Sequence, residues 1–449
     1  MPGDSQEETT VNDKVLIVDG VKWRQASTME TPPEVLTNSW LSVSLDIPNK
    51  REAIVSISLM KDWRILCASY FFSAFHRCLR TQSHFSPRTV VQVIVPARDN
   101  AYLSRLKYKE IEGVTLFVSS IDIKEFRGIA CCKTLLSFSE FTVLIGRNNS
   151  GKSSVLEALS LLPLYTFSLP YSNDSKLGIL EKLHGGKSSM VYGYSGHALL
   201  TYNVLNRIWT LKVKDDGWAE LEIEGIDKDY MRSDMLTAAA KVLAISGGDK
   251  MVYDVNSRVF FIPNDTSFMN NLFSKLGEEQ NRSMITKMGA HARIARDLVN
   301  KCVDDSYTEI LFAPELSARK ERGDGKSPLY IKLKDLGDGV EKVVLTALWL
   351  EAMNPSLVLW DDFEGSAHPT LIKVLLEWLS KKHWQVVIST HSLDVITSLL
   401  EVRPKDAKVV QLRKTNDDVL IHEDLTLEEL EDLIDTSQDP RKLVDSLKL

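Results

Sequence analysis

The chain has 449 residues, of which 44% are apolar and 26% are charged. This is the composition of an ordinary globular protein, and at roughly 150 residues per domain the length allows about three domains. The net charge is −7, and the segment 423–449, with nine acidic and three basic residues, accounts for −6 of it. These values exclude a disordered or fibrous chain and a histone-like excess of basic residues, and they leave nucleic-acid binding open.

Cysteine usage and apolar runs bear on the cellular compartment. The five cysteines are odd in number and form no Cys-x-x-Cys pair, so neither a disulfide scaffold nor a zinc knuckle is expected. The first ten residues are acidic and polar, unlike a secretory signal. The longest uncharged apolar stretch, 65–75, has 11 residues, whereas a membrane-spanning helix needs about 20. The sequence therefore predicts a cytoplasmic protein without membrane insertion.

The segment 1–117 is predicted to be an N-terminal extension of uncertain fold. Its β-branched content predicts short strands at 14–18 and 89–95. Residues 77–109 contain seven basic residues and one acidic residue, Asp99. This pattern fits a patch that binds nucleic acid, but it favours an ordinary solvated surface. The basic residues are Arg77, Arg80, Arg88, Arg98, Arg105, Lys107 and Lys109.

From about residue 116 the pattern becomes regular. Two strands are predicted first, and the second feeds a glycine-rich turn and a helix that Pro163 ends. Two or three strands, a polar helical segment with a break near Gly277 and a strongly apolar helix follow. Two short, all-apolar strands then suit the centre of a parallel sheet covered on both faces. In chain order these elements lie at 116–123, 141–145, 153–162, 198–224 with a turn at 214–217, 266–304, 340–353, 357–360 and 386–389.

A phosphate-binding loop is the strongest signal in the sequence. The segment 146–153 matches G-x-x-x-x-G-K-[ST] at every fixed position, with a strand before it and a helix after it. Glycines let the backbone N–H groups approach a phosphate, and the start of a helix presents its positive end there. The lysine supplies charge to the β- and γ-phosphates, and the serine is an oxygen ligand for Mg²⁺. The predicted nucleotide contacts are Gly146, Arg147, Asn148, Asn149, Ser150, Gly151, Lys152, Ser153 and Ser154.

Three further segments carry polar residues at positions suited to a nucleotide. Asp361 and Asp362 end one apolar strand, where ligands bind in open α/β sheets, and Asp362 is a candidate to orient or deprotonate the attacking water. His391 ends the next apolar strand and is a candidate partner of the γ-phosphate or the water. Gly337, Asp338 and Gly339 precede the apolar helix and offer a second helix start.

In this order, the four elements resemble those of ABC-type ATPases. They resemble more closely the AAA-type ATP-binding proteins related to the RecF, OLD (overcoming lysogenisation defect) and SMC (structural maintenance of chromosomes) ATPases. The segment 121–129 is similar to that group's opening strand, whose Phe-Arg turn, here with Arg127, approaches the nucleotide. The segment 361–369 is similar to its Walker B region, and 389–392 to its switch-histidine motif. The resemblance covers about residues 118–412.

The resemblance implies an α/β P-loop NTPase fold, with a mostly parallel sheet flanked by helices, an antiparallel β subdomain and a helical insertion at about 266–305. It implies ATP and Mg²⁺ as ligands, with Ser153 and Asp361 on the metal. It also implies a homodimer in which the signature residues 337–339 of one subunit cover the nucleotide of the other. The predicted organisation is an extension at 1–117, an ATPase domain at 118–412 and an acidic helical tail at 413–449.

The sequence departs from the family pattern at three points. The catalytic glutamate after the Walker B aspartate is Asp362 here, one methylene shorter, and Glu364 is the alternative candidate. The signature segment 337–339 lacks the family's serine. No Q-loop glutamine is found between the phosphate loop and the signature.

Several functions remain open at the level of sequence. We expect an ATP-hydrolysing dimer switch in a DNA-related or defence process, with nucleic acid or a partner protein as further ligands. The alternatives are a regulatory ATP-binding module with little turnover and an ABC-type transport ATPase subunit. A Toprim nuclease domain is not expected after His391, because only 58 residues (449 − 391) follow it.

The acidic tail contains a predicted helix. Thr426 and Glu429 have the spacing of a capping box, and Leu427, Leu430 and Ile434 fall on one face of the helix that follows. This pattern favours a docked amphipathic helix over an acidic segment that binds a partner.

Overall fold

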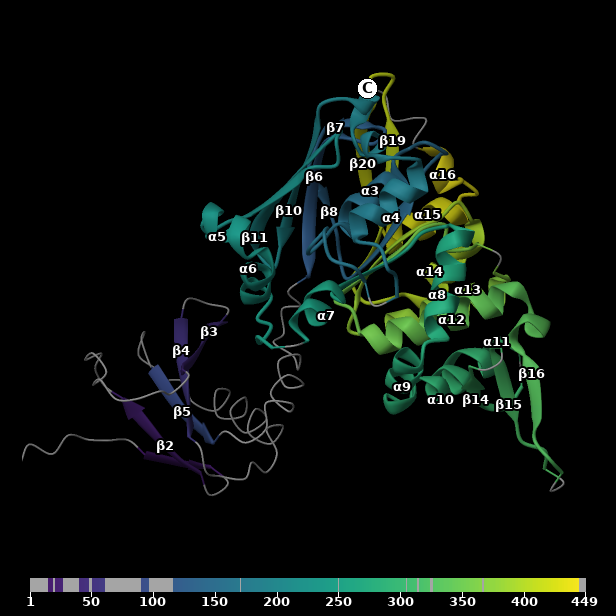
Figure 1. Ribbon diagram of the computed structural model, residues 1–449, viewed down its shortest axis with the longest axis horizontal. Coiled ribbons are helices and arrows are strands. Elements are labelled where there is room, and N and C mark those ends of the chain that lie inside the picture. Colours follow the sequence, from purple (N-terminus) through teal and green to yellow (C-terminus); the bar gives the residue numbers. More distant parts are fainter. Residues whose placement is uncertain are drawn as a thin grey trace, which may run out of the picture. The chain divides into compact units, whose positions relative to one another are not determined.

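The computed structural model describes residues 15–18, 21–26, 40–47, 51–60, 90–96, 116–169, 171–248, 250–303, 305–312, 315–323, 326–365 and 367–443. The chain divides into two units, Met1–Gly113 and Val114–Leu449 (Figure 1). The first unit holds a five-stranded sheet in the order β1-β2-β5-β4-β3. The strands predicted at 14–18 and 89–95 are confirmed as two of its members, and the seven basic residues between 77 and 109 lie outside the described residues. The strands are β1 (Val15–Val18), β2 (Val21–Ala26), β3 (Trp40–Ile47), β4 (Arg51–Met60) and β5 (Val90–Pro96).

A twelve-stranded mixed sheet organises the second unit, in the order β12-β11-β10-β6-β7-β20-β19-β9-β18-β17-β13, with β8 paired to β6. Its first five strands are antiparallel and form the predicted antiparallel subdomain. The predicted turn closes between β11 and β12, where Gly217 N–H donates to the Lys214 carbonyl. The strands of this part are β6 (Val118–Phe126), β7 (Ile129–Cys132), β8 (Leu136–Ser137), β10 (His197–Val204), β11 (Arg207–Lys214) and β12 (Ala219–Ile223).

The other half of the sheet is a run of parallel strands buried on both faces. Neighbours β13, β17, β18, β9 and β19 all run parallel. Side chains alternate between the faces: Val143 and Ile145 enter one hydrophobic cluster, and Leu144 enters the other. This confirms the expectation from the all-apolar strands. The parallel strands are β9 (Phe141–Ile145), β13 (Val259–Ile262), β17 (Leu357–Trp360), β18 (Gln385–Ser389) and β19 (Ala407–Lys414), and β20 (Val419–Thr426) pairs antiparallel with β19.

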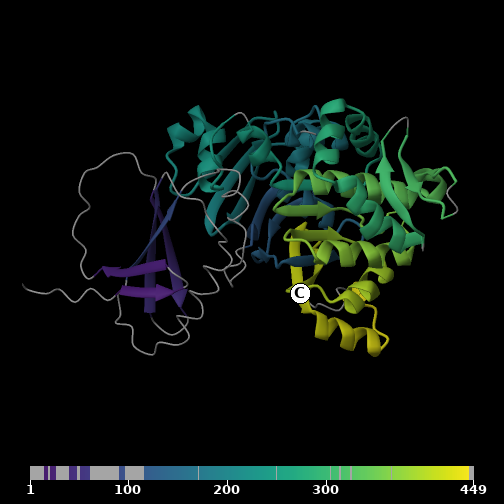
Figure 2. The same ribbon diagram turned by 90° about the horizontal axis from the view of Figure 1, so that it is seen from below.

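Helices cover both faces of this sheet. One face packs on the buried residues of α3 (Lys152–Ser160), α4 (Lys176–His184) and α6 (Met235–Val242). The other packs on α8 (Thr266–Leu276), α9 (Glu279–Lys287), α12, α13 and α14, which Figures 1 and 2 show gathered away from the teal strands β10–β12. The predicted α/β class with helices on both faces is confirmed, and no helix within the described ranges is long and apolar enough to cross a membrane. The remaining bounds are α5 (Lys228–Ser233), α7 (Met251–Asn256), α12 (Asp338–Met353), α13 (Pro369–Ser380) and α14 (Leu393–Val402).

The segment predicted to be helical at 266–304 contains more breaks than expected. The chain interrupts it after Leu276, as predicted near Gly277, and again at Gly289, which has a φ of +67°. Glycine adopts this conformation at little cost, so it permits the second break. A separate antiparallel sheet, β14-β15-β16, follows. The elements are α8 (Thr266–Leu276), α9 (Glu279–Lys287), α10 (Ala290–Ile294), α11 (Asn300–Val303), β14 (Tyr307–Leu311), β15 (Ser317–Lys320) and β16 (Leu329–Lys332).

The C-terminal part begins inside the sheet. β20 pairs with β19 and, in parallel, with β7, so residues 419–426 belong to the sheet and not to the tail expected from 413 onward. The reason is the long-range pairing, which buries Leu420 completely. The capping box is confirmed: Thr426 Oγ1 accepts from Glu429 N–H, and the Glu429 carboxylate accepts from Thr426 N–H. Two helices end the described chain, α15 (Leu427–Asp435) and α16 (Pro440–Leu443).

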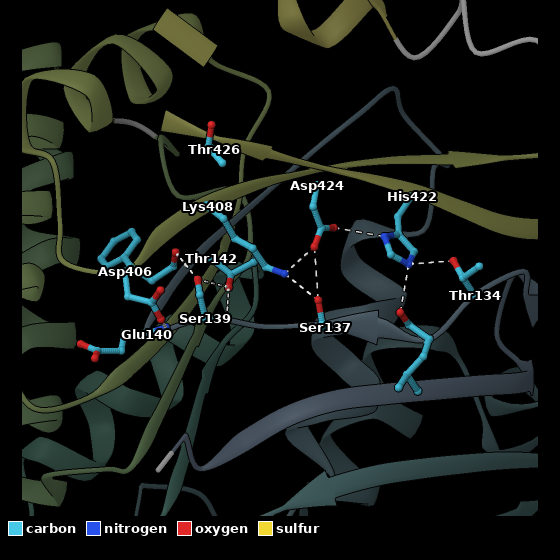
Figure 3. A network of polar contacts seen from close by, with 12 residues as sticks. Thr134, Ser137, Ser139, Glu140, Thr142, Asp406, Lys408, His422, Asp424 and Thr426 are labelled. Atoms are coloured by element: carbon cyan, nitrogen blue, oxygen red, sulfur yellow. Dashed lines mark hydrogen bonds and ion pairs between the residues drawn. The ribbon is translucent and has the colours of Figure 1, made fainter. Parts of the chain in front are cut away.

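A polar network ties the segment before β9 to the β19–β20 hairpin (Figure 3). Lys408 Nζ donates to Asp424 Oδ2 (2.6 Å) and to Ser137 Oγ (2.7 Å). His422 lies 3.2 Å from Asp424 Oδ1 through Nδ1 and 3.0 Å from Thr134 Oγ1 through Nε2. Because these side chains bond one another across three strands, the network fixes the hairpin to the rest of the sheet.

Candidate nucleotide-binding site

The phosphate loop leaves β9 in a conformation that requires glycine. Gly146 has a φ of +149°, and a Cβ there would collide with the carbonyl oxygen of Leu412. Gly151 has a φ of +99° and is the N-cap of α3, so the backbone N–H groups of this helix start point into the loop. The hydroxyl of Ser150 is buried and has no hydrogen-bond partner. Backbone donors and a buried hydroxyl fit a bound phosphate.

Lys152 lies inside this loop. Its Nζ donates to the carbonyl oxygens of Gly146 and Arg147, each at 3.0 Å. Burial lowers the pKa of Lys152, and the nearby charges of Asp362 and Asp361 oppose this effect. The ammonium group is therefore held where a phosphate would lie, by weak carbonyl partners that an anion can replace.

The acidic end of β17 contacts both the loop and the next strand. Ser389 Oγ donates to Asp361 Oδ1 at 2.5 Å. Burial raises the pKa of Asp361, and the hydroxyl groups of Ser389 and Ser153 counteract the rise. The two residues predicted as magnesium ligands therefore lie close enough to influence each other. Within the described part of the chain no group of three or more His, Cys, Asp or Glu side chains could hold a metal by itself.

Asp362 adopts an uncommon backbone conformation, with a φ of +45°. Its Oδ2 accepts a hydrogen bond from Asn264 Nδ2 (2.9 Å), and its Oδ1 lies 3.9 Å from Nε2 of His391. Burial lowers the pKa of the neighbouring Lys342, and Asp362 opposes that shift. The carboxylate of Asp362 is a third exposed and faces the histidine predicted from the next strand.

Glu364, the alternative candidate, accepts a hydrogen bond at each of its two oxygens. Its Oε2 accepts from Thr390 Oγ1 (2.8 Å), and its Oε1 accepts from the backbone N–H of His391 (2.7 Å). Both oxygens therefore hold the segment after β18, and this carboxylate orients the histidine segment.

One contributor escaped the sequence analysis. Asn264 lies just after β13, which runs parallel to β17, so it joins the same edge of the sheet. The sequence does hold a signal for this strand. Residues 259–262 are an all-apolar run with a polar residue soon after it, as in β17 and β18. No neighbouring motif drew attention to it.

Arg127 forms an ion pair with a carboxylate of the protein itself. Its Nε lies 3.0 Å from Glu157 Oε2, and Glu157 Oε1 lies 2.8 Å from His184 Nε2. Burial lowers the pKa of Arg127, and the charge of Glu157 raises it. Glu157 belongs to α3, the helix that follows the phosphate loop. Arg127, predicted to contact the nucleotide, is therefore connected to this helix through its ion pair with Glu157.

The glycine segment 337–339 lies at the start of α12, a different element from the phosphate loop. Gly337 and Asp338 are exposed, and Gly337 has a φ of +117°. A Cβ on Gly337 would meet no atom within 4 Å. This helix start faces open space, whereas the phosphate loop, Asp361, Asp362 and His391 meet at the carboxyl ends of adjacent parallel strands.

Two segments of the chain that contribute to this site match models of known protein families. Residues 117–178 match a family model for an AAA ATPase domain, and residues 302–397 match one described as "AAA domain, putative AbiEii toxin, Type IV TA system". No curated protein matches the sequence.

Solved structures similar to the chain include SMC heads. An Smc head bound to the C-winged helix domain of ScpA has a TM-score of 0.46 at 15% identity, covering 70% of this chain and 99% of that one. An Smc head domain from Pyrococcus furiosus with an extended coiled coil, bound to the C-terminal domain of ScpA, has a TM-score of 0.44 at 14% identity, with coverages of 72% and 99%. The SMC head domain from Thermotoga maritima has a TM-score of 0.40 at 17% identity, with coverages of 69% and 100%.

The two family matches include the phosphate loop, the Walker B strand and the switch histidine, and the sheet brings these three segments to one edge. The two matched segments are therefore similar to AAA-type ATPase domains, and they carry these motifs in the order that the sequence resemblance implies.

Proposed function

We propose that the protein binds ATP with Mg²⁺ at the carboxyl ends of β9, β17 and β18, and that it hydrolyses the γ-phosphate. The buried carboxylate of Asp361 at the end of β17, beside the buried lysine and the serine of the phosphate loop, carries this proposal. A serine hydroxyl and a carboxylate at a phosphate cradle have the chemistry that Mg²⁺ prefers when it binds through one or two protein oxygens and the phosphates.

The protein's own groups have separate parts in the reaction. Lys152 balances the charge of the β- and γ-phosphates, and Ser153 and Asp361 hold the metal. When bound, Mg²⁺ offsets the negative charge that develops on the phosphate oxygens. Asp361 must be ionised for this purpose, and the hydroxyl bonds of Ser389 and Ser153 favour that form.

Asp362 is the proposed acceptor of the water proton. Its side chain is one methylene shorter than that of glutamate. The side-chain amide of Asn264 donates to it, and we propose that this amide takes the place of the Q-loop glutamine of the family. His391 faces Asp362 from the neighbouring strand, in position to donate to the γ-phosphate. Glu364 acts through His391, because both of its oxygens are bonded to the histidine segment.

The proposed working unit is a head-to-tail homodimer. A second helix start is useful to ATP only if it approaches the γ-phosphate from the opposite side, and the exposed segment 337–339 is available to another subunit. ATP would then hold the dimer closed, and ADP would release it. We place this switch in a DNA-related or defence process, with nucleic acid or a partner protein as further ligands; one matched family's description names the AbiEii toxin.

A second function is favoured by one observation. Glu364 holds the segment after β18 with both of its oxygens, and Asp362 is one methylene shorter than the glutamate that the family resemblance places there. A regulatory module that binds ATP with little turnover is therefore the second candidate.

Steady-state ATP turnover in Mg²⁺ distinguishes the two functions. We expect Asp362→Ala to lower kcat by at least about 100-fold, the size typical of a lost general base, while calorimetry shows unchanged ATP affinity. Asp297→Ala, in an exposed ion pair on another element, is the matched control and should retain full turnover. If the wild type turns over no faster than Lys152→Ala while it still binds ATP, the regulatory module is correct. Absence of ATP binding would refute both.

A further inference from the structure

The backbone of His391 is held at its N–H and at its carbonyl oxygen by charged side chains. Its N–H donates to Glu364 Oε1 at 2.7 Å, and its carbonyl oxygen accepts from Arg441 Nη1 at 2.6 Å. Glu364 follows the Walker B strand, whereas Arg441 comes from the last described helix, α16 (Figure 1). The backbone of the histidine that faces Asp362 is therefore bonded to a residue 50 positions further along the chain.

The guanidinium group of Arg441 is also held by a second residue, Asp439. Its Nε and Nη2 donate to the two oxygens of Asp439 at 2.9 and 2.8 Å, a bidentate pair. Together with the bond to His391, all three guanidinium nitrogens are engaged. Three of its five N–H groups are thus used by acceptors within the protein, which favours an indirect role over that of a phosphate-binding arginine.

The segment 438–441, called the C-terminal strap here, is also anchored beside the phosphate loop. Gln411 of β19 is almost fully buried, and its Nε2 donates to the carbonyl oxygen of Pro440 at 2.5 Å. Gln411 pairs in register with Ile145, the residue before the phosphate loop. The strap thus joins two parts of the nucleotide site that lie far apart in the sequence.

We propose that Arg441 is a positioning residue for His391, and that the C-terminal strap couples the end of the chain to the ATP site. The proposal rests on the proposed function, since it assigns His391 to the γ-phosphate or its water. A movement of the His391 peptide on nucleotide binding must be followed by Arg441 and the strap, or must break this bond. A displacement of the strap would in turn move the imidazole away from Asp362.

The first test measures turnover. We expect Arg441→Ala to lower kcat by about tenfold, because small misplacements of reacting groups have effects of this size or larger, with KM and the calorimetric Kd for ATP unchanged. Arg441→Lys, which can still reach the carbonyl but cannot form the bidentate pair, should recover part of kcat. Arg403→Ala removes a different ion pair, the one from the end of α14 to Glu431 of α15, and should leave kcat unchanged. Equal losses in Arg441→Ala and Arg403→Ala would overturn the proposal, since general loosening of the C-terminal part would then explain them.

A double-mutant cycle separates positioning from stability. If Arg441 acts through the imidazole, its removal in the His391→Ala background should cause no further loss of kcat. Additive losses of kcat would refute the role assigned to Arg441.

The second test does not depend on turnover. Hydrogen exchange of a peptide spanning residues 389–392 should be faster in Arg441→Ala than in wild type, and unchanged in Arg403→Ala. Exchange at wild-type rates in Arg441→Ala would refute the clamp. If the wild type has no ATPase activity, the proposed function fails, and the exchange rates still decide whether Arg441 holds His391.

Discussion

Lys152 shows how one side chain is prepared for an anion. Its ammonium group is buried, which lowers its pKa, and the two loop carbonyls that it contacts are neutral. A phosphate provides a charged partner instead, and charge-assisted hydrogen bonds are about twice as strong as neutral ones.

Removing this charge should weaken ATP binding. We expect Lys152→Ala to raise the calorimetric Kd for ATP by at least about tenfold, equivalent to ~1.4 kcal/mol. Lys212→Ala, on a strand of the antiparallel subdomain, is a control of the same residue type and should bind as wild type. An unchanged Kd in Lys152→Ala would contradict the assignment of the phosphate loop.

Also at the residue scale, the sequence left two carboxylates as candidates for the water. Asp362 and Glu364 are two positions apart in the same acidic segment, and no spacing rule separates them. The hydrogen bonds from Thr390 and His391 to Glu364 do separate them, and these partners come from another strand.

At the scale of elements, the β19–β20 hairpin is the connection between the ATP site and the C-terminal helices. Burial alone would raise the pKa of Asp424, but hydrogen bonds from His422 and Lys408 dominate and lower it to about 2. A carboxyl group with a depressed pKa stabilises the fold above its unfolded pKa of 3.8, and this contribution is lost as the pH falls toward 2.

We therefore expect Asp424→Asn to reduce the free energy of unfolding at neutral pH by about 1 kcal/mol, after allowing for solvent screening of a side chain that is 36% exposed. Urea unfolding should show this gap between wild type and variant closing below about pH 4, because the wild-type carboxyl group becomes neutral as well. Asp417→Asn, in the turn of the same hairpin, should show no gap. A gap that persists at low pH would mean that the network, and not the charge, is responsible.

Elements with a strong local pattern were predicted well. The strands at 141–145 and 357–360 have the predicted bounds, because runs of apolar residues with polar neighbours mark strands buried on both faces. The break at Gly289 was missed, since glycine is tolerated within helices and its φ is decided by the packing of the flanking turns. Residues 419–426 were assigned to the tail because only pairing with β7 and β19 reveals them as a sheet strand.

At the scale of the whole molecule, ATP should control assembly. In sedimentation experiments Asp362→Ala, which retains ATP, should form dimers with ATP and monomers with ADP or without nucleotide. Adding Asp338→Arg should block the dimer while each subunit still binds ATP. Asp338 is the suitable position because it is exposed, whereas Gly337 has a φ of +117° and Gly339 is buried. Asp229→Arg, also in the first turn of a helix, is the control. The same mass under all three conditions would refute the switch.

The division of the chain leads to a further prediction. A shortened protein beginning at residue 115 should fold and bind ATP with the affinity of the full chain, because every motif lies in the unit Val114–Leu449. Size-exclusion chromatography and calorimetry measure both properties. If the shortened protein aggregates while the full chain stays soluble, the first unit is needed for folding.

The sequence by itself determined the phosphate loop, the α/β class, and the two strands that end in Asp361 and Asp362 and in His391. These depend on spacing within short segments and on apolar runs, which are properties of local sequence. The tertiary structure decided which carboxylate remains available, that Asn264 joins the site and that Arg441 holds His391. These contacts join residues up to 98 positions apart. The contacts of Asn264 and Glu364 arise only when parallel strands pack side by side and present their carboxyl ends at one edge, and the contact of Arg441 requires helix α16 to pack beside that edge.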